Sequence, residues 1–523
     1  MLQSLRQNPR RARVSRGESI PAPVEGWDAI SPLATMKETR APVLTNWFPQ
    51  PGYVEVRKGN SEWSTGVVDG TTSVETLMCY NGLTTATDAM FSIGGGSIYD
   101  STDNAAASVT TVTGLTNSRF QYVNYTTSGG THYIHCCNGA DDVLSYDGST
   151  WSNPSFTGIT SSDVINLNVH KQRIWGIING SMDAFYLATD AISGTATKFP
   201  LGSVMKEGGY LMAMATWTRD GGAGPDDYAV FISSRGQVAV YGGIDPSDST
   251  DFVLVGVYQI PPPIGRRCFT RVAGDIAVIT ISGVIPLSRA IQQDRAAEAG
   301  IALTLRINNA MNTYAQSYKS LFGWELTPYP LGTMAILNIP IAENVTNYQA
   351  VMNTLTGAWC LFTGWDFNCF AVFQDNLYAG ANDGTVRKCW TGATDDGTTI
   401  DAQGQCAYNY FSPRGRQKRF VALQPLITTD QDITPSVGIS TDFRDNASVS
   451  TPSSSTTNSA LYDAAIWDTD VYATEARSSS DWTSISGIGD CAAVHFRCST
   501  NSTGSQTVKV NGFHIIYETG EFF

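Results

Sequence analysis

Charge, histidine and long apolar runs are all scarce in this chain of 523 residues. Only 15% of the residues are charged, and five are histidine. No run approaches the roughly 18–20 consecutive apolar residues of a membrane-spanning helix, so we expect no stable membrane insertion. The basic N-terminus is not followed by an apolar core, so we do not interpret it as a secretory signal.

Recognisable catalytic motifs are also missing. The chain has no GxSxG, HExxH, P-loop or protein-kinase signature. Its ten cysteines are scattered without a CxxC pair, and several lie in apolar runs, where a free thiol acts as a small hydrophobe. This use of cysteine predicts folding in a reducing compartment. We predict no enzyme activity, no cofactor and no metal site.

The negative charge of the chain is unevenly distributed. The formal net charge is -14, yet residues 1–17 contain no acidic residue and five arginines, namely Arg6, Arg10, Arg11, Arg13 and Arg16. The remaining chain is strongly acidic, so it is unsuited to gripping nucleic acid by neutralising phosphates. It could still surround nucleic acid without binding it tightly.

Residues 1–45 are predicted to form an extended arm. Five prolines exclude a long helix: Pro9, Pro21, Pro23, Pro32 and Pro42. Trp27, Trp47 and Phe48 are large apolar anchors in or just after the arm. We expect the arm to pack either on its own body or on a neighbouring subunit.

From about residue 46 to residue 400, the sequence repeats a strand, a turn and a strand that ends near an aromatic residue. Hairpins are predicted over residues 89–100, 143–151, 173–189, 228–241, 275–287 and 371–390, with glycine in each turn. The spacing of roughly 40–50 residues is typical of propeller blades, and we predict a mainly β chain with a β-propeller of about six blades.

Two regions depart from the repeat. Residues 286–322 are rich in helix-forming residues, with Ser288 as a candidate N-cap, a first helix ending at Gly300 and a second over Ile301–Tyr318. This helical insertion serves packing or contacts a partner. Residues 401–523 contain a Ser- and Thr-rich loop at 445–459 and strands at 494–498, 507–510 and 513–517, which predict a C-terminal β-sandwich.

The run HYIHCC contains His132, His135, Cys136 and Cys137, all of types that bind zinc. On a strand, however, His135 and Cys137 share one face, while His132 and Cys136 share the other. No second ligand pair stands at a recognisable spacing. We favour residues of a core or an interface.

The run from Ser145 to Trp151 looks like the Asp-box of sialidase propellers, although its glycine falls one position early. Even a true Asp-box stabilises a hairpin. Nothing marks the arginine cluster, tyrosine nucleophile and acid partner that a sialidase would need.

Paired carboxylates and glycine runs are interpreted as turns. Neighbouring residues on a turn point apart, so we expect no acid–base pair at Asp141-Asp142, Asp226-Asp227 or Asp395-Asp396. The runs Gly94-Gly95-Gly96 and Gly221-Gly222-Ala223-Gly224 do not open a helix after a parallel strand, as phosphate-binding loops do.

A basic cluster lies in SPRGRQKRF and contains Arg414, Arg416, Lys418 and Arg419. It either contacts nucleic acid or an acidic partner, or it compensates local charge and faces a neighbouring subunit. Together with Trp27, Trp47 and the arginines of the arm, these residues are the candidate partner contacts.

Two stretches of the sequence resemble a known protein family. Residues 21–59 (PAPVEGWDAISPLATMKETRAPVLTNWFPQPGYVEVRKG) and residues 321–390, which include FGWELTPYPLGTMAILNIP, resemble the tail nozzle (tail tube or hub) proteins of short-tailed bacteriophages. The order of arm, propeller with helical insert and C-terminal β domain also resembles that family.

The resemblance implies a virion structural protein, made in the cytoplasm of a host bacterium, that forms a homohexameric tube below the portal. Its partners would be a head–tail adaptor, tail fibres or tailspikes, and genomic DNA that passes without sequence-specific binding. An acidic wall would let DNA slide. A receptor- or glycan-binding virion propeller is the alternative, followed by a glycosidase or depolymerase.

Overall fold

The structure is a computed structural model that describes residues 15–64, 72–220, 225–272, 274–291, 300–412, 414–429, 435–444, 477–479, 481–500 and 507–522. Two compact units divide the chain. Unit 1 combines Met1–Arg57 with Thr399–Phe523, and unit 2 is Lys58–Thr398. The predicted boundary near residue 400 thus lies close to a boundary between units, whereas the predicted arm contributes strands to unit 1.

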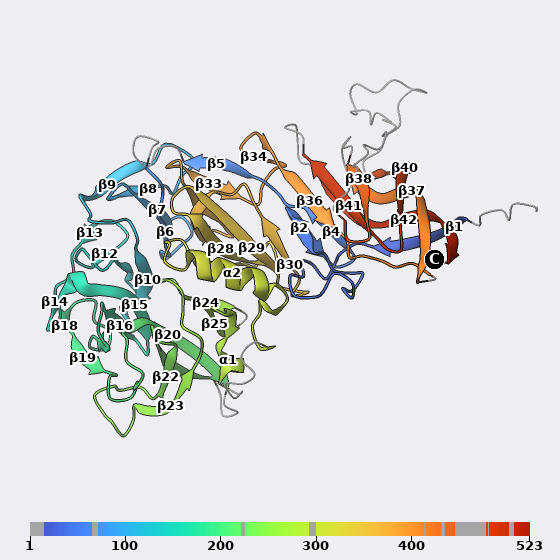
Figure 1. Cartoon of the computed structure of the whole chain (residues 1–523). Coiled ribbons are helices and arrows are strands. Elements are labelled where there is room, and N and C mark those ends of the chain that lie inside the picture. Colours follow the sequence, from blue (N-terminus) through green and yellow to red (C-terminus); the bar gives the residue numbers. More distant parts are fainter. Residues whose placement is uncertain are drawn as a thin grey trace, which may run out of the picture. The chain divides into compact units, whose positions relative to one another are not determined.

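Unit 2 is built from small sheets, each made mostly of consecutive antiparallel strands (Figure 1). The first sheet contains β6 (Thr76–Tyr80), β7 (Ala89–Gly94), β8 (Ser97–Asp100) and β9 (Ser108–Thr113). The second contains β10 (Gln121–Thr126), β11 (His132–Cys137), β12 (Leu144–Tyr146) and β13 (Trp151–Ser152). The third contains β15 (Val164–His170), β16 (Arg173–Ile178), β17 (Asp183–Tyr186) and β19 (Thr197–Pro200).

The same pattern continues along unit 2. The fourth sheet contains β20 (Leu211–Asp220), β21 (Pro225–Ser233), β22 (Gln237–Gly242) and β23 (Val253–Gln259), and the fifth β24 (Phe269–Val272), β25 (Asp275–Thr280) and β26 (Gly283–Pro286). The sixth set of strands is β27 (Glu325–Tyr329), β28 (Met334–Ala342), β29 (Thr346–Asn353) and β30 (Trp359–Phe362). The last sheet contains β31 (Phe367–Phe373), β32 (Asn376–Ala381), β33 (Val386–Cys389), β5 (Asn60–Ser64), β34 (Thr394–Asp395) and, at the boundary, β35 (Thr398–Thr399).

All six predicted hairpins are present: β7–β8, β12–β13, β16–β17, β21–β22, β25–β26 and β31–β32–β33. Their turns use the expected chemistry. Gly95 and Gly96 join β7 to β8 with φ of 56° and 72°, the left-handed conformation that a tight hairpin turn requires. The mainly β prediction is therefore confirmed.

Neighbouring sheets of unit 2 contact one another around a closed ring. Strand β10 lies against β15, β15 against β20, β20 against β25, β24 against β27, β27 against β31, and β31 against β6. The remaining contact of the ring is between β6 and β10, where the Asn124 side chain of β10 donates a hydrogen bond to the Cys79 carbonyl of β6 at 2.8 Å. This arrangement is propeller-like. We predicted about six repeats, and the described part of unit 2 has seven sets of three or more strands.

Apolar cores lie between successive sheets. Phe91 of β7 packs with Ile134 of β11, and Trp175 of β16 packs with Phe231 of β21, whose ring centroid lies 5.7 Å away. A small parallel pair, β14 (Phe156–Thr157) with β18 (Gly194–Thr195), and the 3-10 turn η1 (Ser161–Asp163) complete this side of the ring.

One strand of the ring comes from far away in the sequence. Strand β5 pairs antiparallel with β33, so that Ser64 lies opposite Val386 and Asn60 opposite Cys389. The last sheet therefore joins the first strand of unit 2 to its final hairpin. Such pairing holds the ring closed, because the first strand of unit 2 and its final hairpin can separate only if the hydrogen bonds of this sheet break.

The predicted helical insertion is present, and its second helix is shorter than expected. Helix α1 spans Leu287–Ala290 and helix α2 spans Asn308–Tyr318, preceded by the turn η3 (Leu305–Ile307). The first predicted helix extends into residues 292–299, which lie outside the described residues. The second begins at Asn308 and not at Ile301, because Leu303 donates a backbone hydrogen bond to Val284 of β26 and Thr304 accepts one from the same residue.

Unit 1 contains two groups of paired strands. One is β2 (Val43–Thr45), β36 (Asp401–Gln405), β41 (Ala492–Ser499) and β38 (Ser436–Thr441). The other is β3 (Trp47–Gln50), β4 (Tyr53–Val56), β42 (Val508–Phe522), β37 (Arg416–Thr429) and β39 (Arg477–Ser479), with β1 (Ser15–Pro21) on β42 and β40 (Thr483–Gly489) on β37. Phe496 of β41 contacts both Trp47 of β3 and Phe513 of β42, with centroid distances of 5.1 and 5.4 Å.

One prediction for unit 1 needs correction. The strands predicted at 507–510 and 513–517 are one strand, β42, whose register with β37 shifts between Val510 and Gly512. Residues 15–21 of the predicted arm form β1, which pairs with β42 and so packs on the chain's own unit 1. The predicted loop at 445–459 lies outside the described residues.

All ten cysteines are buried free thiols. No helix in the described ranges is both long and apolar enough to cross a membrane.

Candidate functional site

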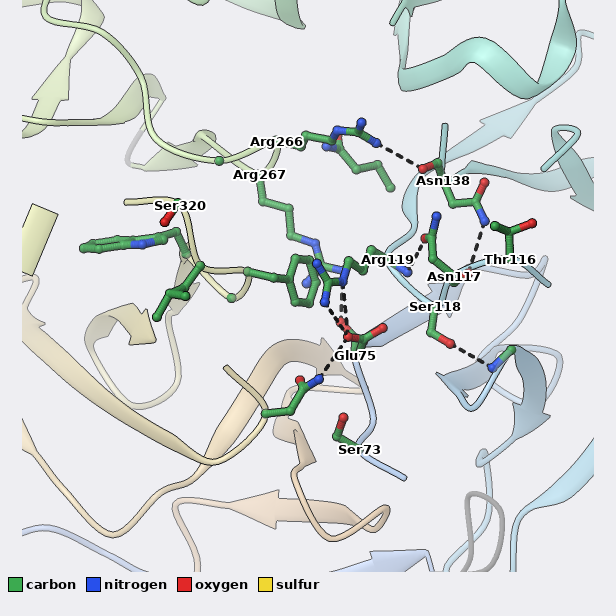
Figure 2. Close-up of a pocket in the computed structure, with 18 of the residues that line it drawn as sticks. Ser73, Glu75, Thr116, Asn117, Ser118, Arg119, Asn138, Arg266, Arg267 and Ser320 are labelled. Atoms are coloured by element: carbon green, nitrogen blue, oxygen red, sulfur yellow. Dashed lines mark hydrogen bonds and ion pairs between the residues drawn. The ribbon is translucent and has the colours of Figure 1, made fainter. Parts of the chain in front are cut away.

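Two cavities lie along the centre of unit 2. The inner cavity, of about 460 Å³, is lined by strands from six sheets: β6, β10, β15, β24, β27 and β31. The mouth cavity, of about 680 Å³, is lined by connecting loops such as residues 95–96, 116–118, 265–267 and 319–324 (Figure 2). Arg266, Arg267 and Gln121 line both cavities. A propeller-like ring brings these separate loops together at one end of its centre.

An ion-pair network stands at the mouth cavity. Arg119 lies between the carboxylates of Glu75 and Glu343, at 3.1 Å from Glu75 and in close contact with Glu343. Asn344 also donates to Glu75, at 3.3 Å. Burial works against the charge of Arg119, but the two carboxylates raise its pKa above the ordinary value. Glu75 and Arg119 stand just before β6 and β10, and Glu343 lies in the turn between β28 and β29, so the three charges connect three different sheets at this end of the ring.

Arg267 makes a second connection across the ring. Its guanidinium pairs with Glu325 of β27 at 2.9 Å. It also donates to the Thr76 hydroxyl at 2.7 Å and to the carbonyls of Glu75 and Phe120 at 3.2 and 3.1 Å. A single side chain thus joins β6, the start of β10, and β27. Planar guanidinium groups suit such multiple donation.

Phe322 of the loop after α2 lies between the two guanidinium groups. Its ring centroid is 4.5 Å from Arg119 and 5.0 Å from Arg267, within the range of cation–π attraction. Its backbone N–H donates to Glu343 at 3.3 Å. The helical insertion is therefore fastened to the ring centre by Phe322, which favours a packing role for this part of the insertion.

These side chains hold the loops and strands of different sheets together at the ring centre. The two central arginines are occupied by carboxylates and backbone carbonyls. Within the described ranges, no three His, Cys, Asp or Glu side chains are grouped to hold a metal ion. The arrangement can bind an anion or stabilise the ring.

The HYIHCC run forms β11, and Cys136 and Cys137 belong to two different apolar cores. Cys136 and Cys137 are fully buried, and burial raises the pKa of both thiols, to well above the ordinary range. His135 is also fully buried, and burial lowers its pKa to about 4, so it is neutral at pH 7. His132 contacts the Thr126 hydroxyl at 3.1 Å. The four residues do not converge on one point.

The Asp-box-like run forms the β12–β13 turn. Asp147 accepts hydrogen bonds from the backbone and hydroxyl of both Ser149 and Thr150. The backbone bond from Thr150 is the largest cause that lowers the pKa of Asp147 to about 2. This carboxylate stabilises its own hairpin.

The paired carboxylates likewise serve separate partners. Asp141 accepts from Thr116 and Asn138, and Asp227 accepts from the Thr218 hydroxyl. Asp395 accepts from Asn60 and Trp365, whereas Asp396 pairs with Arg387. Gly94-Gly95-Gly96 belongs to a hairpin. Gly221 to Gly224 lie outside the described residues, as does the side chain of Asp226.

The basic cluster does not form one surface. Lys418 is fully buried in β37 and donates to the Asp490 carbonyl at 2.8 Å, to its carboxylate at 3.2 Å and to the Arg416 carbonyl at 3.1 Å. Arg419 points the other way and is 62% exposed. Arg414 is exposed and lies 4.6 Å from the Tyr410 ring centroid, while Arg416 is half-buried.

The other candidate contacts lie at different places in unit 1. Arg16 is exposed on β1 and donates to the Ser412 carbonyl at 3.3 Å, and Trp27 is half-buried. Trp47 is fully buried in the core, so it is not available to a partner. Arg6, Arg10, Arg11 and Arg13 lie outside the described residues.

The residues at the ring centre carry no motif in the sequence. Glu75, Arg119, Arg267, Phe322 and Glu325 are single residues spread over about 250 positions. The adjacent pair Arg266-Arg267 is the one local signal that could have indicated them.

Comparisons with known proteins give no family. No family model matches the chain, and no curated protein matches it. Among solved structures, the extracellular domain of the one component system BT4673 from B. thetaiotaomicron has a TM-score of 0.42 and 10% identity, covering 85% of this chain and 63% of that chain.

Two further solved structures are similar at the same low level. The computationally designed Ika8 protein has a TM-score of 0.36 and 10% identity, covering 63% of this chain and 100% of that one. YCF48 bound to D1 peptide has a TM-score of 0.27 and 9% identity, covering 65% and 95%. Such values assign no function to this chain.

Proposed function

We propose that this chain is a structural component of a short phage tail, a nozzle protein that forms a tube below the portal and its adaptor. The observation that carries the proposal is the resemblance of residues 21–59 and 321–390 to that family. The first stretch supplies β2, β3 and β4, and the second supplies β27 to β33. The resemblance thus falls on strands that build both units, as expected for a protein that works by its shape.

We further infer a seven-bladed propeller for unit 2, with β5 completing the last blade, and a β-sandwich for unit 1. The ring of strand contacts supports the first inference, and the Trp47–Phe496–Phe513 core between two groups of strands supports the second. A propeller leaves only short, protected edges and broad outer faces for neighbouring copies.

The acidic composition is compatible with a DNA conduit. A net charge of -14 would keep a tube wall from gripping phosphates, so the genome could slide through the assembled ring. The tube would be a homohexamer that plugs and conducts genomic DNA and offers docking surfaces to fibres or tailspikes. A strongly basic lumen in the assembled tail would contradict this role.

The decisive experiment is imaging of the virion that contains this chain. We expect the chain to form a ring on the portal axis, below the adaptor. A position on the capsid surface or at a fibre tip would contradict the proposal.

Assembly can be tested with purified components. We expect the isolated protein to be monomeric or weakly associated, and to become hexameric on its adaptor. Light scattering after size-exclusion chromatography, with and without adaptor, measures this difference.

The alternative is a receptor- or glycan-binding propeller of the virion, which a glycan array would reveal. An open aromatic platform would favour it, but at the mouth cavity Phe322 lies between two guanidinium groups and Trp324 is buried. For a glycosidase or depolymerase, the purified protein would degrade polysaccharide, and we expect no turnover.

A further inference from the structure

The mouth cavity is rich in positive charge for so acidic a protein. Four cationic side chains line it: Arg119, Arg266 and Arg267, which are labelled in Figure 2, and Lys319. Glu75 is the carboxylate among the lining residues, and Glu343 and Glu325 lie beside the cavity as the ion-pair partners of Arg119 and Arg267. Arg119 and Arg267 are satisfied by the ion pairs described above. The question is which groups remain available to a ligand.

Most N–H groups of the Arg266 and Lys319 side chains make no hydrogen bond or ion pair to the described residues. Arg266 donates to the Asn138 carbonyl at 3.0 Å, and no carboxylate of the described residues pairs with it. Lys319 follows α2, is exposed, and has no ion pair within the described ranges. A guanidinium has five N–H donors and an ammonium three, so both can bind further acceptors.

Gln121 adds a buried donor between the two cavities. Its Oε1 accepts a hydrogen bond from Asn166 at 2.6 Å, which orients the amide. Its Nε2 is buried and has no acceptor in the structure. A buried polar group without a partner is costly, and a bound acceptor would satisfy it.

We propose that the mouth cavity binds a small ligand through a phosphate or carboxylate group, held by Arg266 and Lys319, with Gln121 as a donor at the cavity floor. Oxyanions match this set, because all three groups donate and charge-assisted bonds are the strongest of their kind. The cavity of about 680 Å³ is larger than one oxyanion and within the usual size of ligand sites.

The rest of the ligand would meet hydroxyl and amide groups. Ser73, Thr116, Ser118, Ser320 and Asn117 line the same cavity, so a hydroxyl-bearing molecule such as a sugar acid or sugar phosphate fits. A long polyanion fits less well, since the chain as a whole would repel it. This proposal does not depend on the tail function, because it rests on residues within unit 2 and requires neither assembly into a tube nor a partner protein.

Isothermal titration calorimetry on the full chain at low ionic strength tests the site, with inorganic phosphate, glucose 6-phosphate and glucuronate as separate probes. Binding of the two phosphates alone supports a phosphate site, binding of glucuronate alone supports a carboxylate site, and binding of all three supports a general oxyanion site. If none of the three binds, the proposal is wrong.

Four variants locate the binding. Arg266→Gln and Lys319→Gln should each weaken it about tenfold, the usual effect of losing a charged hydrogen-bond donor. Gln121→Glu keeps the acceptor for Asn166 but replaces the buried donor with a negative charge, and should abolish binding. Arg235→Gln, at an exposed arginine in the β21–β22 turn, is the matched control and should bind as the wild type does. Equal affinity in all four variants would overturn the proposed site.

Discussion

The two units build their sheets from different kinds of neighbours. In unit 2, most strands pair with the strand just before or after them, and one distant strand, β5, completes the last sheet. In unit 1, β1 and β4 from the start of the chain pair with β42 from its end. A change in unit 2 should therefore stay within adjacent sheets, whereas a change in unit 1 should loosen segments hundreds of residues apart.

The largest effect is expected when a buried aromatic residue is removed from each unit, and the two variants test whether the damage spreads differently in the two units. Phe496→Ala in unit 1 and Trp175→Ala in unit 2 should each lower the free energy of unfolding by about 3–5 kcal/mol, since each leaves a cavity in an aromatic core. Hydrogen exchange should rise in both β3 and β42 for Phe496→Ala. For Trp175→Ala it should rise mainly in the third and fourth sheets. Exchange that rises equally everywhere in both variants would remove the distinction.

Acid should weaken unit 2 through its buried histidines. Burial lowers the pKa of His135 and His170 to about 4, from an ordinary value of 6.5. As the pH falls, the histidines of the unfolded chain are protonated before the buried histidines of the folded chain. Their contribution to the free energy of unfolding is therefore fully present above pH 6.5, and about 3 kcal/mol per histidine is lost as the pH falls toward 4.

Urea unfolding at pH 7, 6 and 5 measures this loss. His135→Leu should reduce the pH dependence. Tyr133→Phe alters the ring stacked on His135 without removing an imidazole, so it should keep the wild-type dependence. An unchanged slope in His135→Leu would show that this histidine is not responsible.

A buried lysine allows a sharper test of unit 1. Lys418→Ala removes the ammonium that donates to the Asp490 carboxylate and to two carbonyls, and the carboxylate keeps only the Gly415 N–H among its described donors from β37 and the turn before it. We therefore expect a loss of about 2 kcal/mol in the free energy of unfolding. Arg419→Ala, on the opposite face of the same strand, should cost less than about 0.5 kcal/mol. Similar losses in the two variants would mean that burial does not separate their roles.

The smallest effect is expected at a single hairpin of unit 2. Asp147→Ala removes the acceptor of four turn hydrogen bonds and should cost about 1 kcal/mol, with faster hydrogen exchange confined to β12 and β13. Asp142→Ala, at an exposed neighbouring turn, is the control and should change little. Faster exchange in distant sheets would contradict the local character of this unit.

The same difference explains what the sequence could predict. Six hairpins were predictable because a turn and its two strands lie within about 20 residues, where glycine and alternation are visible. The pairing of β5 with β33 and of β1 with β42 left no local signal. The cluster at the ring centre was missed for the same reason, since Arg119 and Glu325 acquire a common environment only when the sheets meet.

Alternation along a strand also divides the basic cluster. Four cations close together in sequence left open a partner contact or compensation of local charge, and β37 buries Lys418 beside Asp490 while it exposes Arg419. The sequence shows that these four residues are charged, but it does not show to which face of the strand each side chain points. Direction depended on β40 and β42, the neighbours of this strand in the sheet.

The pairing of β5 with β33 has a consequence for synthesis on the ribosome. Strand β5 is made about 320 residues before its partner, so at roughly 5–20 residues per second it waits on the order of 15–65 s for the last sheet. Throughout that interval the growing ring has an open end with unpaired backbone groups. Chaperones that cover exposed strands would be most needed in this interval, and slower translation would lengthen the exposure.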